Sequence, residues 1–432
     1  MTQVVVHPNL AALPRPNAGR IPVLLYGTNP HINGSGAIGN PVWDRVSRVQ
    51  AALNPIAFDF LSLSMAVTAA DTFVNRDEAP DGWARKIDLS VALADPQRWQ
   101  PVIPTLERAL SFLSGDEWSL EVVGGGELPP PPRARVQDKV SLAGCDSACL
   151  YSGGLDSAIG VLDLRSQGRN PVLVSHGYTR DAGRQVELLR HLGAGLSRFA
   201  TSAAPAAWLG RGNDVQMRTR SFNFLAMGAL MASALGPQRT TLFVPENGLI
   251  ALNPPLTNRR IGALSTRTTH PHYLHLVQQV WEAVGLNVAL DNPYARMTKG
   301  EMMGNCAEQA SLARIAPRSV SCGKWKRTGL QCGRCVPCLI RRASFHAAGW
   351  VDRTVYSPAG GNLARFFRTG NETDDLMAMI LAARRLDEID MESWVAKTGP
   401  LPISAQDRQQ RVAAVHRGMI EVRDFLVSKN LL

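Results

Sequence analysis

The sequence predicts an α/β protein with a parallel twisted sheet and helices on both faces. It also predicts a zinc-binding cysteine segment, an N-terminal α+β domain and a helical C-terminal tail. Three observations support this fold class. From residue 146 on, strand-like and helix-like apolar runs alternate, which is typical of a parallel sheet. One strand leads directly into a Ser-Gly-Gly-x-Asp-Ser turn and a helical run. Four cysteines gather within residues 322–338, a spacing that favours a metal site.

The first 125 residues predict an α+β accessory domain. Residues 1–20 are rich in Pro and Asn, and we expect them to form an irregular arm. This region shows no catalytic constellation, so we expect it to serve in docking or in gating of a substrate. Apolar spacing predicts its elements: helices over 43–53, 56–73 and 104–113, and strands over 23–26, 86–93 and 118–123.

A linker is predicted over residues 126–140, because three glycines are followed shortly by a run of prolines. The sheet domain follows over 141–350 and the helical region over 351–432. Ligands of open α/β sheets bind off the carboxyl ends of the strands, so residues 152–157, 176–177 and 246–248 should meet at one edge. The expected elements are strands at 147–151, 171–176, 196–200 and 240–245, and helices at 185–192, 222–235, 374–385, 391–397 and 408–427.

Residues 152–157, Ser-Gly-Gly-Leu-Asp-Ser, have the chemistry of an anion-binding turn. Glycines allow a tight turn and a close approach to a ligand. The first N–H groups of the following helix have no partner within that helix, and two serines add hydroxyl donors. The turn lacks the lysine of the Walker P-loop. An ordinary glycine turn with a serine cap is the alternative.

The cysteine segment has the spacing C-x9-C-x2-C-x2-C. Four thiolates brought together by tight turns suit a tetrahedral structural zinc ion. Disulfides are one alternative, although nothing in the sequence indicates an oxidising compartment. An iron–sulfur cluster is another. The expected ligands are Cys322, Cys332, Cys335 and Cys338.

The Ser-Gly-Gly-x-Asp-Ser turn resembles the pyrophosphate loop (PP-loop) of the N-type ATP pyrophosphatases, which have an adenine nucleotide alpha hydrolase-like fold. Together with the later cysteine cluster, it resembles the 7-cyano-7-deazaguanine synthases (QueC) over roughly residues 140–350. The resemblance implies ATP-dependent adenylation of a carboxylate such as 7-carboxy-7-deazaguanine, followed by attack of an amine to give an amide or nitrile. The length and the N-terminal extension resemble the QueC-like proteins of the Qat anti-phage defence system.

The resemblance also implies roles for single residues, with ATP, Mg²⁺ and Zn²⁺ as cofactors. Asp156 would position Mg²⁺ or fix the loop. Lys299, in a segment that resembles the T-K-x-E element of the family, would contact the phosphates; a surface lysine is the alternative. The pyrophosphate would be held by Ser152, Gly153, Gly154, Leu155, Asp156 and Ser157.

Further candidates lie at strand ends and helix starts. Arg220 and Asn223 resemble an element that precedes the central helix of the family, with a helix-start salt bridge as the alternative. His176 is a candidate for contact with adenine or ribose, and a structural histidine is equally compatible. Glu246 keeps its place after a strand, but residues 247–256 lack the Asp and Cys of the family's acceptor stretch.

Arg267 lies in a hydroxyl-rich segment, 265–270. This segment is a candidate for an anionic ligand or for base edges. A capped helix start before residue 273 is the alternative. The nearby histidines 270, 272 and 275 have marginal metal spacing, and a second metal is not favoured because no carboxylate lies close in the sequence.

The net charge of +10 raises the question of nucleic-acid binding. Small basic clusters at 259–260, 324–327 and 341–342 lie near the predicted site, where nucleotide and pyrophosphate would account for them; nucleic-acid binding is an alternative that is not favoured. No signal pattern is visible. The apolar run 222–235 is too short to span a bilayer. We therefore expect a cytoplasmic protein without a membrane partner.

Three functions remain open at this stage. The first is the carboxylate-activating ligase, whose amine could come from a partner protein of the same defence system. The second is a tRNA-modifying PP-loop ligase or sulfurtransferase. The third is a non-catalytic, ATP-sensing subunit of a defence complex.

Overall fold

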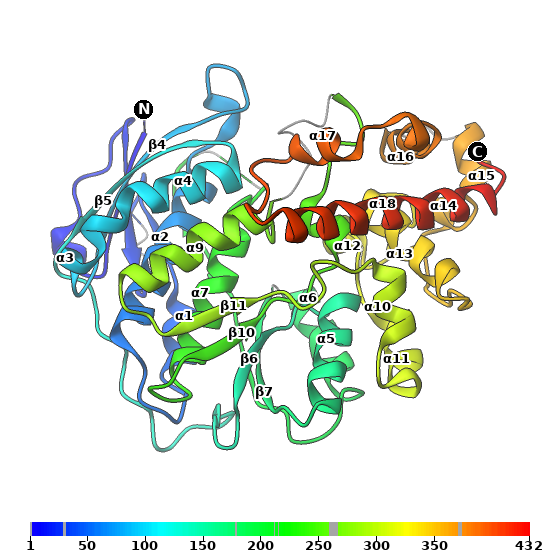
Figure 1. Cartoon of the computed structure of the whole chain (residues 1–432). Coiled ribbons are helices and arrows are strands. Elements are labelled where there is room, and N and C mark those ends of the chain that lie inside the picture. Colours follow the sequence, from blue (N-terminus) through cyan, green and yellow to red (C-terminus); the bar gives the residue numbers. More distant parts are fainter. Residues whose placement is uncertain are drawn as a thin grey trace.

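The computed structural model describes residues 2–28, 32–177, 179–210, 212–214, 216–258, 267–369 and 374–432. Two sheets lie in succession across the molecule, with helices between them and on the far side of the second (Figure 1). The first sheet has the strand order β5-β4-β1-β2-β3-β9, and the second has the order β11-β10-β6-β7-β8.

The first sheet is parallel except at its β9 edge. β1 lies between β2 and β4, and Val4 and Val6 of β1 are buried in the core. The irregular arm expected over residues 1–20 is therefore wrong for residues 2–7, where three consecutive valines favour a strand over the Pro- and Asn-rich stretch that follows. The strands are β1 (Thr2–His7), β2 (Arg20–Leu25), β3 (Gly36–Ile38), β4 (Lys86–Ala92), β5 (Glu117–Val123) and β9 (Ala206–Ala207).

Helices α1 (Asn40–Val46), α2 (Pro55–Phe73), α3 (Pro96–Trp99) and α4 (Ile103–Ser114) accompany the first sheet. The helix expected over 43–53 already ends at Val46. Beyond it, Gln50 N donates to Val140 O at 2.9 Å and Val140 N donates to Arg48 O at 3.0 Å. The segment after Val46 thus pairs with the predicted linker, a long-range contact that helical spacing does not encode.

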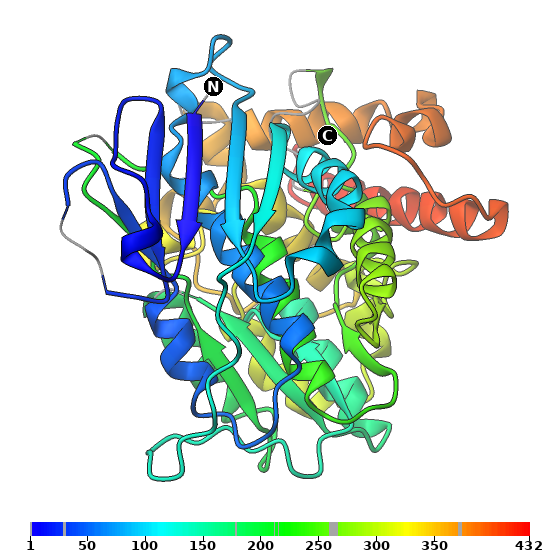
Figure 2. The same ribbon diagram turned by 90° about the vertical axis from the view of Figure 1, so that its left-hand side faces the viewer.

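α2 lies behind the first sheet (Figure 2) and packs against β4 on one side and α7 (Arg220–Ser233) on the other. Asn54 begins the helix by accepting a hydrogen bond from Ile56 N at 2.9 Å. Among the described residues, α2 is the helix long and apolar enough to cross a membrane, and 94% of its most apolar window is buried inside the protein. Such a buried helix is equally typical of a protein core.

The second sheet is parallel throughout. Its strands alternate between two cores: Ala148 and Leu150 face α7 and α9, whereas Cys149 and Tyr151 face α5. The predicted parallel sheet with helices on both faces is confirmed. Its elements are β6 (Ser147–Leu150), β7 (Pro171–His176), β8 (Arg198–Thr201), β10 (Thr240–Phe243), β11 (Val288–Asp291), α5 (Leu155–Ser166), α6 (Thr179–Leu189), α8 (Gly248–Leu252), α9 (Pro271–Ala283) and α10 (Lys299–Asn305).

One hydrophobic core includes residues of both sheets. β9, which follows β8 in the chain, pairs with β3 of the first sheet. The two sheets are thus joined by packing and by backbone hydrogen bonds. The domain boundary within residues 126–140 remains a prediction.

The C-terminal part is helical, as the sequence predicts, and has its own core. α18 crosses above α10 and α13 in Figure 1 and packs against both. The helices are α11 (Gln309–Ile315), α12 (Trp325–Thr328), α13 (Val336–Ala347), α14 (Pro358–Gly361), α15 (Leu363–Thr369), α16 (Asp374–Arg384), α17 (Met391–Ala396) and α18 (Ala405–Val427).

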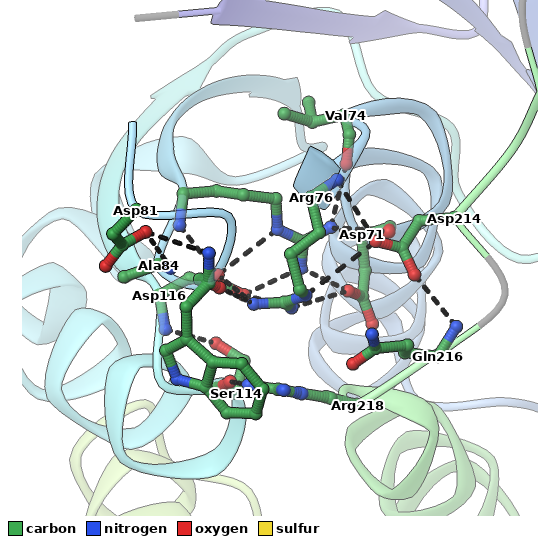
Figure 3. A network of polar contacts seen from close by, with 12 residues as sticks. Asp71, Val74, Arg76, Asp81, Ala84, Ser114, Asp116, Asp214, Gln216 and Arg218 are labelled. Carbon is green, nitrogen blue, oxygen red and sulfur yellow. Dashed lines mark hydrogen bonds and ion pairs between the residues drawn. The ribbon is translucent and has the colours of Figure 1, made fainter. Parts of the chain in front are cut away.

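A buried network of arginines and aspartates connects the first sheet to the start of α7 (Figure 3). Asp116 accepts from Arg76 NH1 at 2.8 Å and from Arg85 NH2 at 2.7 Å, and these three side chains are at most 2% exposed. Asp71 accepts from the backbone N–H and the hydroxyl of Thr219 at 2.9 and 2.8 Å. Thr219 directly precedes α7, so the network fixes where that helix begins.

Replacing Asp116 by alanine should destabilise the fold by about 3–5 kcal/mol, because it leaves buried arginine charge without its partner. Burial opposes ionisation of Asp116, but hydrogen bonds and charge from Arg85 hold its pKa below the usual value. Urea unfolding would measure the loss. The neighbouring Glu117→Ala is the matched control, because the Lys86–Glu117 pair is exposed and should contribute at most about 1 kcal/mol. Equal losses in the two variants would contradict the role of the network.

Candidate functional site

The Ser152–Ser157 turn connects β6 to α5 at the carboxyl edge of the second sheet, as predicted. Gly153 has φ +80°, a conformation that glycine adopts without strain. The Ser152 and Ser157 hydroxyls lie 3.2 Å apart, and Gly154 N donates to Ser152 Oγ at 3.2 Å. The turn therefore places two hydroxyls beside the start of a 12-residue helix, which is a suitable arrangement for an anion.

Three predicted residues from different elements meet beside this turn. Asp156, on the first turn of α5, is buried and forms an ion pair with Lys299, the first residue of α10. Asn247 donates to Asp156 Oδ2 through its backbone at 3.1 Å and through its side chain at 2.7 Å. The same amide group donates to Glu246 Oε1 at 3.0 Å. Asn247 thus joins the two carboxyl groups.

The environment shifts the pKa values of the two carboxyl groups in opposite directions. Burial alone would raise the pKa of Asp156, but the Lys299 charge and the hydrogen bonds lower it to about 2. Burial and the Asp156 charge raise the pKa of Glu246 well above its usual value. Asp156 is therefore the carboxylate that pairs with Lys299, and Glu246 is the carboxyl group that burial and this neighbouring charge make harder to ionise. Carboxylate oxygens at this position also suit Mg²⁺.

Asn292 positions Glu246 from the neighbouring strand end. It follows β11, accepts from Glu246 N at 3.2 Å and donates to Glu246 O at 2.9 Å. Sequence reasoning missed this residue, although the same rule that groups strand ends at one edge could have found it.

His176 and Arg220 also come together, at the end of β7. Arg220 Nε donates to His176 Nδ1 at 3.2 Å, and its NH2 group donates to His176 O at 3.1 Å and to Asp181 Oδ2 at 3.2 Å. His176 is buried and Arg220 partly exposed. This contact joins the start of α7 to the sheet edge and leaves part of the guanidinium accessible.

α6 packs against the Ser152–Ser157 turn through Gln185, a residue that sequence reasoning missed, and against Arg220 through Asp181. Gln185 is buried and donates to Ser152 O at 3.2 Å. A Cβ at Gly153 would lie 3.1 Å from Gln185 Cγ, and one at Gly177 would lie 2.8 Å from Asp181 Cβ. The turn and the strand end therefore need glycine where α6 approaches. No sequence motif marks Gln185.

Asn223 and Arg267 contact helices of the first sheet. Asn223 is fully buried, and its amide lies 3.4 Å from Thr68 Oγ1 of α2. Arg267 donates to Phe112 O of α4 at 2.9 Å and stacks over the Phe112 ring. Their nucleotide-binding roles remain predictions. Residues 259–266, which include part of the predicted hydroxyl-rich segment and the 259–260 basic pair, lie outside the described residues.

His270 caps α9, which is the alternative considered for this segment. Its Nδ1 accepts from His272 N at 3.2 Å and its Nε2 lies 2.9 Å from Thr398 Oγ1. Burial lowers the pKa of His270 to about 3, so it remains neutral at physiological pH.

The four predicted cysteine ligands form one buried cluster. Their sulfur atoms lie within 4.8 Å of one another. The Cys332–Cys338 and Cys322–Cys335 sulfurs are 3.9 Å apart, too far for a disulfide and close to the roughly 3.8 Å expected between ligands of a tetrahedral zinc ion. Cys322 Sγ accepts N–H groups from Lys324 at 3.3 Å and Cys332 at 3.2 Å. The residues therefore fit zinc.

A backbone hydrogen bond connects the segment before the cysteine cluster to the Ser152–Ser157 turn. Val320, two residues before Cys322, donates from its backbone N–H to Gly153 O at 3.0 Å. Arg341 of α13 is fully buried and donates to Ser319 Oγ at 2.8 Å. A metal held by the cysteines would thus stabilise the segment that supports Gly153.

No family model matches this chain. The chain is 27% identical over 234 residues to 7-cyano-7-deazaguanine synthase 1 of Sphingopyxis alaskensis, which covers 48% of this chain and 96% of that relative. It is 35% identical over 77 residues to the 7-cyano-7-deazaguanine synthase of Methylobacillus flagellatus, which covers 18% of this chain and 32% of that relative. These similarities support a QueC-like family and, at that level, an ATP-using synthase or ligase.

The purified chain should contain about one zinc ion per molecule, bound by the cysteine cluster. Cys332→Ser should lose this zinc and expose residues 319–322 to faster amide hydrogen exchange. Elemental analysis and hydrogen-exchange mass spectrometry would measure the two effects. Cys145→Ser is the control, since Cys145 lies outside the cluster. Iron with acid-labile sulfide in place of zinc would show that the cluster is of the iron–sulfur type.

Glu246→Gln should raise the melting temperature of the ligand-free protein at pH 8 and have little effect near pH 4. A carboxyl group whose folded-state pKa is raised contributes stability below its ordinary pKa, and this contribution is lost as pH rises through the folded value. Glutamine does not ionise, so the variant avoids that loss. Melting curves of both proteins across this pH range would test it. An equal rise in melting temperature at pH 4 and at pH 8 would indicate that the substitution acts through packing and not through ionisation.

Proposed function

We propose that the chain is an ATP-dependent C–N ligase that forms AMP and pyrophosphate by activating a carboxylate on a 7-deazaguanine-like heterocycle. One observation supports this most: the Ser152–Ser157 turn and the cluster of Asp156, Lys299 and Glu246 lie at the same edge of a parallel sheet. The similarity to two 7-cyano-7-deazaguanine synthases supports the substrate class.

The chain's residues suit the first half of such a reaction. A carboxylate oxygen attacks the α-phosphorus of ATP, the bond to the β-phosphate oxygen breaks, and pyrophosphate leaves. The Ser152 and Ser157 hydroxyls and the helix start would hold the leaving group. The Lys299 ammonium would neutralise charge on the phosphates. Asp156 and Glu246 would hold Mg²⁺, which would supply positive charge that neutralises the phosphates.

In the second half, an amine attacks the acyl carbon, the bond to AMP breaks, and an amide forms with loss of a proton. With ammonia as the amine, a second adenylation on the amide oxygen, followed by departure of that oxygen with AMP and loss of both N–H protons, would give a nitrile. We propose that the amine belongs to a partner protein of an anti-phage defence system. This is supported by the resemblance to the Qat proteins and by the divergence of residues 247–256 from the family's acceptor stretch.

The remaining cysteines favour a ligase over a sulfurtransferase. A sulfurtransferase needs a reactive thiolate, but burial raises the pKa of Cys149 far above its usual value and that of Cys306 to about 12. Cys145 is half-buried, and burial raises its pKa as well. The other four cysteines form the metal-type cluster.

Pyrophosphate and AMP release from ATP should depend on 7-carboxy-7-deazaguanine, and Asp156→Ala should lower the rate at least about 100-fold, as loss of a preorganised electrostatic group does. A coupled pyrophosphate assay would measure the rate. Glu187→Gln, on an exposed carboxylate of α6, is the control and should retain wild-type activity.

Two outcomes would contradict the proposal. Release that is unaffected by the carboxylate substrate would exclude its activation. Efficient formation of free nitrile from ammonia, with no mass increase on any co-expressed partner protein, would exclude the protein-amine step while leaving the adenylation intact.

A further inference from the structure

The C-terminal helix α18 packs against three helices that carry or directly follow site residues. These are α8, which follows Glu246 and Asn247, α10, which begins at Lys299, and α13, which contains Cys338. Figure 1 shows α18 lying across α10 and α13. α18 thus packs against the site on the side away from the first sheet.

The start of α10 has a local cap and a second, long-range support. Thr298 Oγ1 accepts from Glu301 N at 3.0 Å and Thr298 N donates to Glu301 Oε2 at 2.9 Å, which is a capping box. From α18, Glu421 accepts hydrogen bonds from the Thr298 hydroxyl and, at 3.2 Å, from Gly300 N. Arg417 of the same helix pairs with Glu301 at 2.5 Å. Residues on both sides of Lys299 are therefore attached to α18.

Glycines allow α18 to approach this closely. A Cβ at Gly300 would lie 2.5 Å from Glu421 Oε1, and a Cβ at Gly418 would lie 3.0 Å from Leu249 Cδ2 of α8. A side chain at Gly300 would displace the Glu421 carboxylate, and a side chain at Gly418 would press on Leu249.

We propose that Glu421 is a positioning residue that fixes the first turn of α10 and thereby holds the Lys299 ammonium against Asp156. The proposal rests on the function above, in which Lys299 contacts the ATP phosphates. Glu421 itself touches neither of these two side chains through its hydrogen bonds, which go to Thr298 and Gly300. Burial raises the pKa of Glu421 to about 7, so the side chain is mostly ionised at pH 8.

Three variants at Glu421, assayed for pyrophosphate release at pH 8, test this role. Glu421→Ala should lower kcat/KM for ATP about tenfold, the scale of removing one charge-assisted hydrogen bond. Glu421→Gln keeps an acceptor and should stay within about twofold of wild type. Glu421→Asp, which shortens the side chain and keeps the charge, should fall between them and covers the case in which the alanine variant does not fold. Asp387→Asn is the control, because Asp387 is 80% exposed and pairs with Arg423 of α18.

A double-mutant cycle separates positioning from general loss of stability. If Glu421 acts through Lys299, then Glu421→Ala should cause no further loss of activity in a Lys299→Ala background, since interacting residues are non-additive. Full additivity of the two losses would overturn the proposal. An unchanged kcat/KM in folded Glu421→Ala would overturn it as well.

A readout without catalysis distinguishes failure of this proposal from failure of the proposed function. Lys299 is 6% exposed and should resist acetylation by acetic anhydride in the wild type. Glu421→Ala should accelerate acetylation of Lys299 about tenfold relative to Glu421→Gln and Asp387→Asn, as a loss of about one hydrogen bond predicts. This result in a protein with no ATP activity would support the positioning role and reject the ligase. An unchanged rate of Lys299 acetylation in Glu421→Ala, in a protein that releases pyrophosphate from ATP, would reject the positioning role and leave the proposed ligase function standing.

Discussion

The ion pair between Asp156 and Lys299 is the constraint on which the rest of the site depends. Both side chains are 7% exposed, and removing two charges from water costs more than the pair recovers unless other hydrogen bonds compensate. Asn247 supplies two of these bonds to Asp156. Because Asp156, Asn247 and Lys299 begin or precede three different helices, the pair determines how those helices meet. A buried ion pair contributes little net stability. Its position at the carboxyl edge of the sheet therefore favours a role in binding or catalysis over a purely structural one.

Contacts from α2 and from α18 support the site from two sides. On one side, Asp71 of α2 binds Thr219, and the next residue, Arg220, contacts His176 at the end of β7. On the other side, α18 binds the residues that flank Lys299. The first sheet and the C-terminal helices therefore have a physical route to the site. The route through α2 is buried and charged, so small displacements there are costly.

Much of this fold follows from local sequence patterns. The parallel sheet, the turn at 152–157, the helix start at Lys299 and the cysteine cluster are each encoded within short stretches, where propensity and spacing suffice. β1 was missed because a six-residue strand gains its stability from β2 and β4, which lie far along the chain. Gln185 and Glu421 were missed for the same reason, since each acts across a tertiary contact that no motif records.

Asn223 and Arg267 show where a motif resemblance needs the structure. Arg220 and Asn223 are neighbours on one helix face, but the long guanidinium reaches β7 while the short amide contacts α2. Arg267 extends toward α4, where a backbone carbonyl and an aromatic ring hold it. Spacing thus identified the helix that carries Arg220 and Asn223 and left open which neighbours the side chains of all three residues would meet. Side-chain length decided this, together with the packing of α2 beside Asn223 and of α4 beside Arg267.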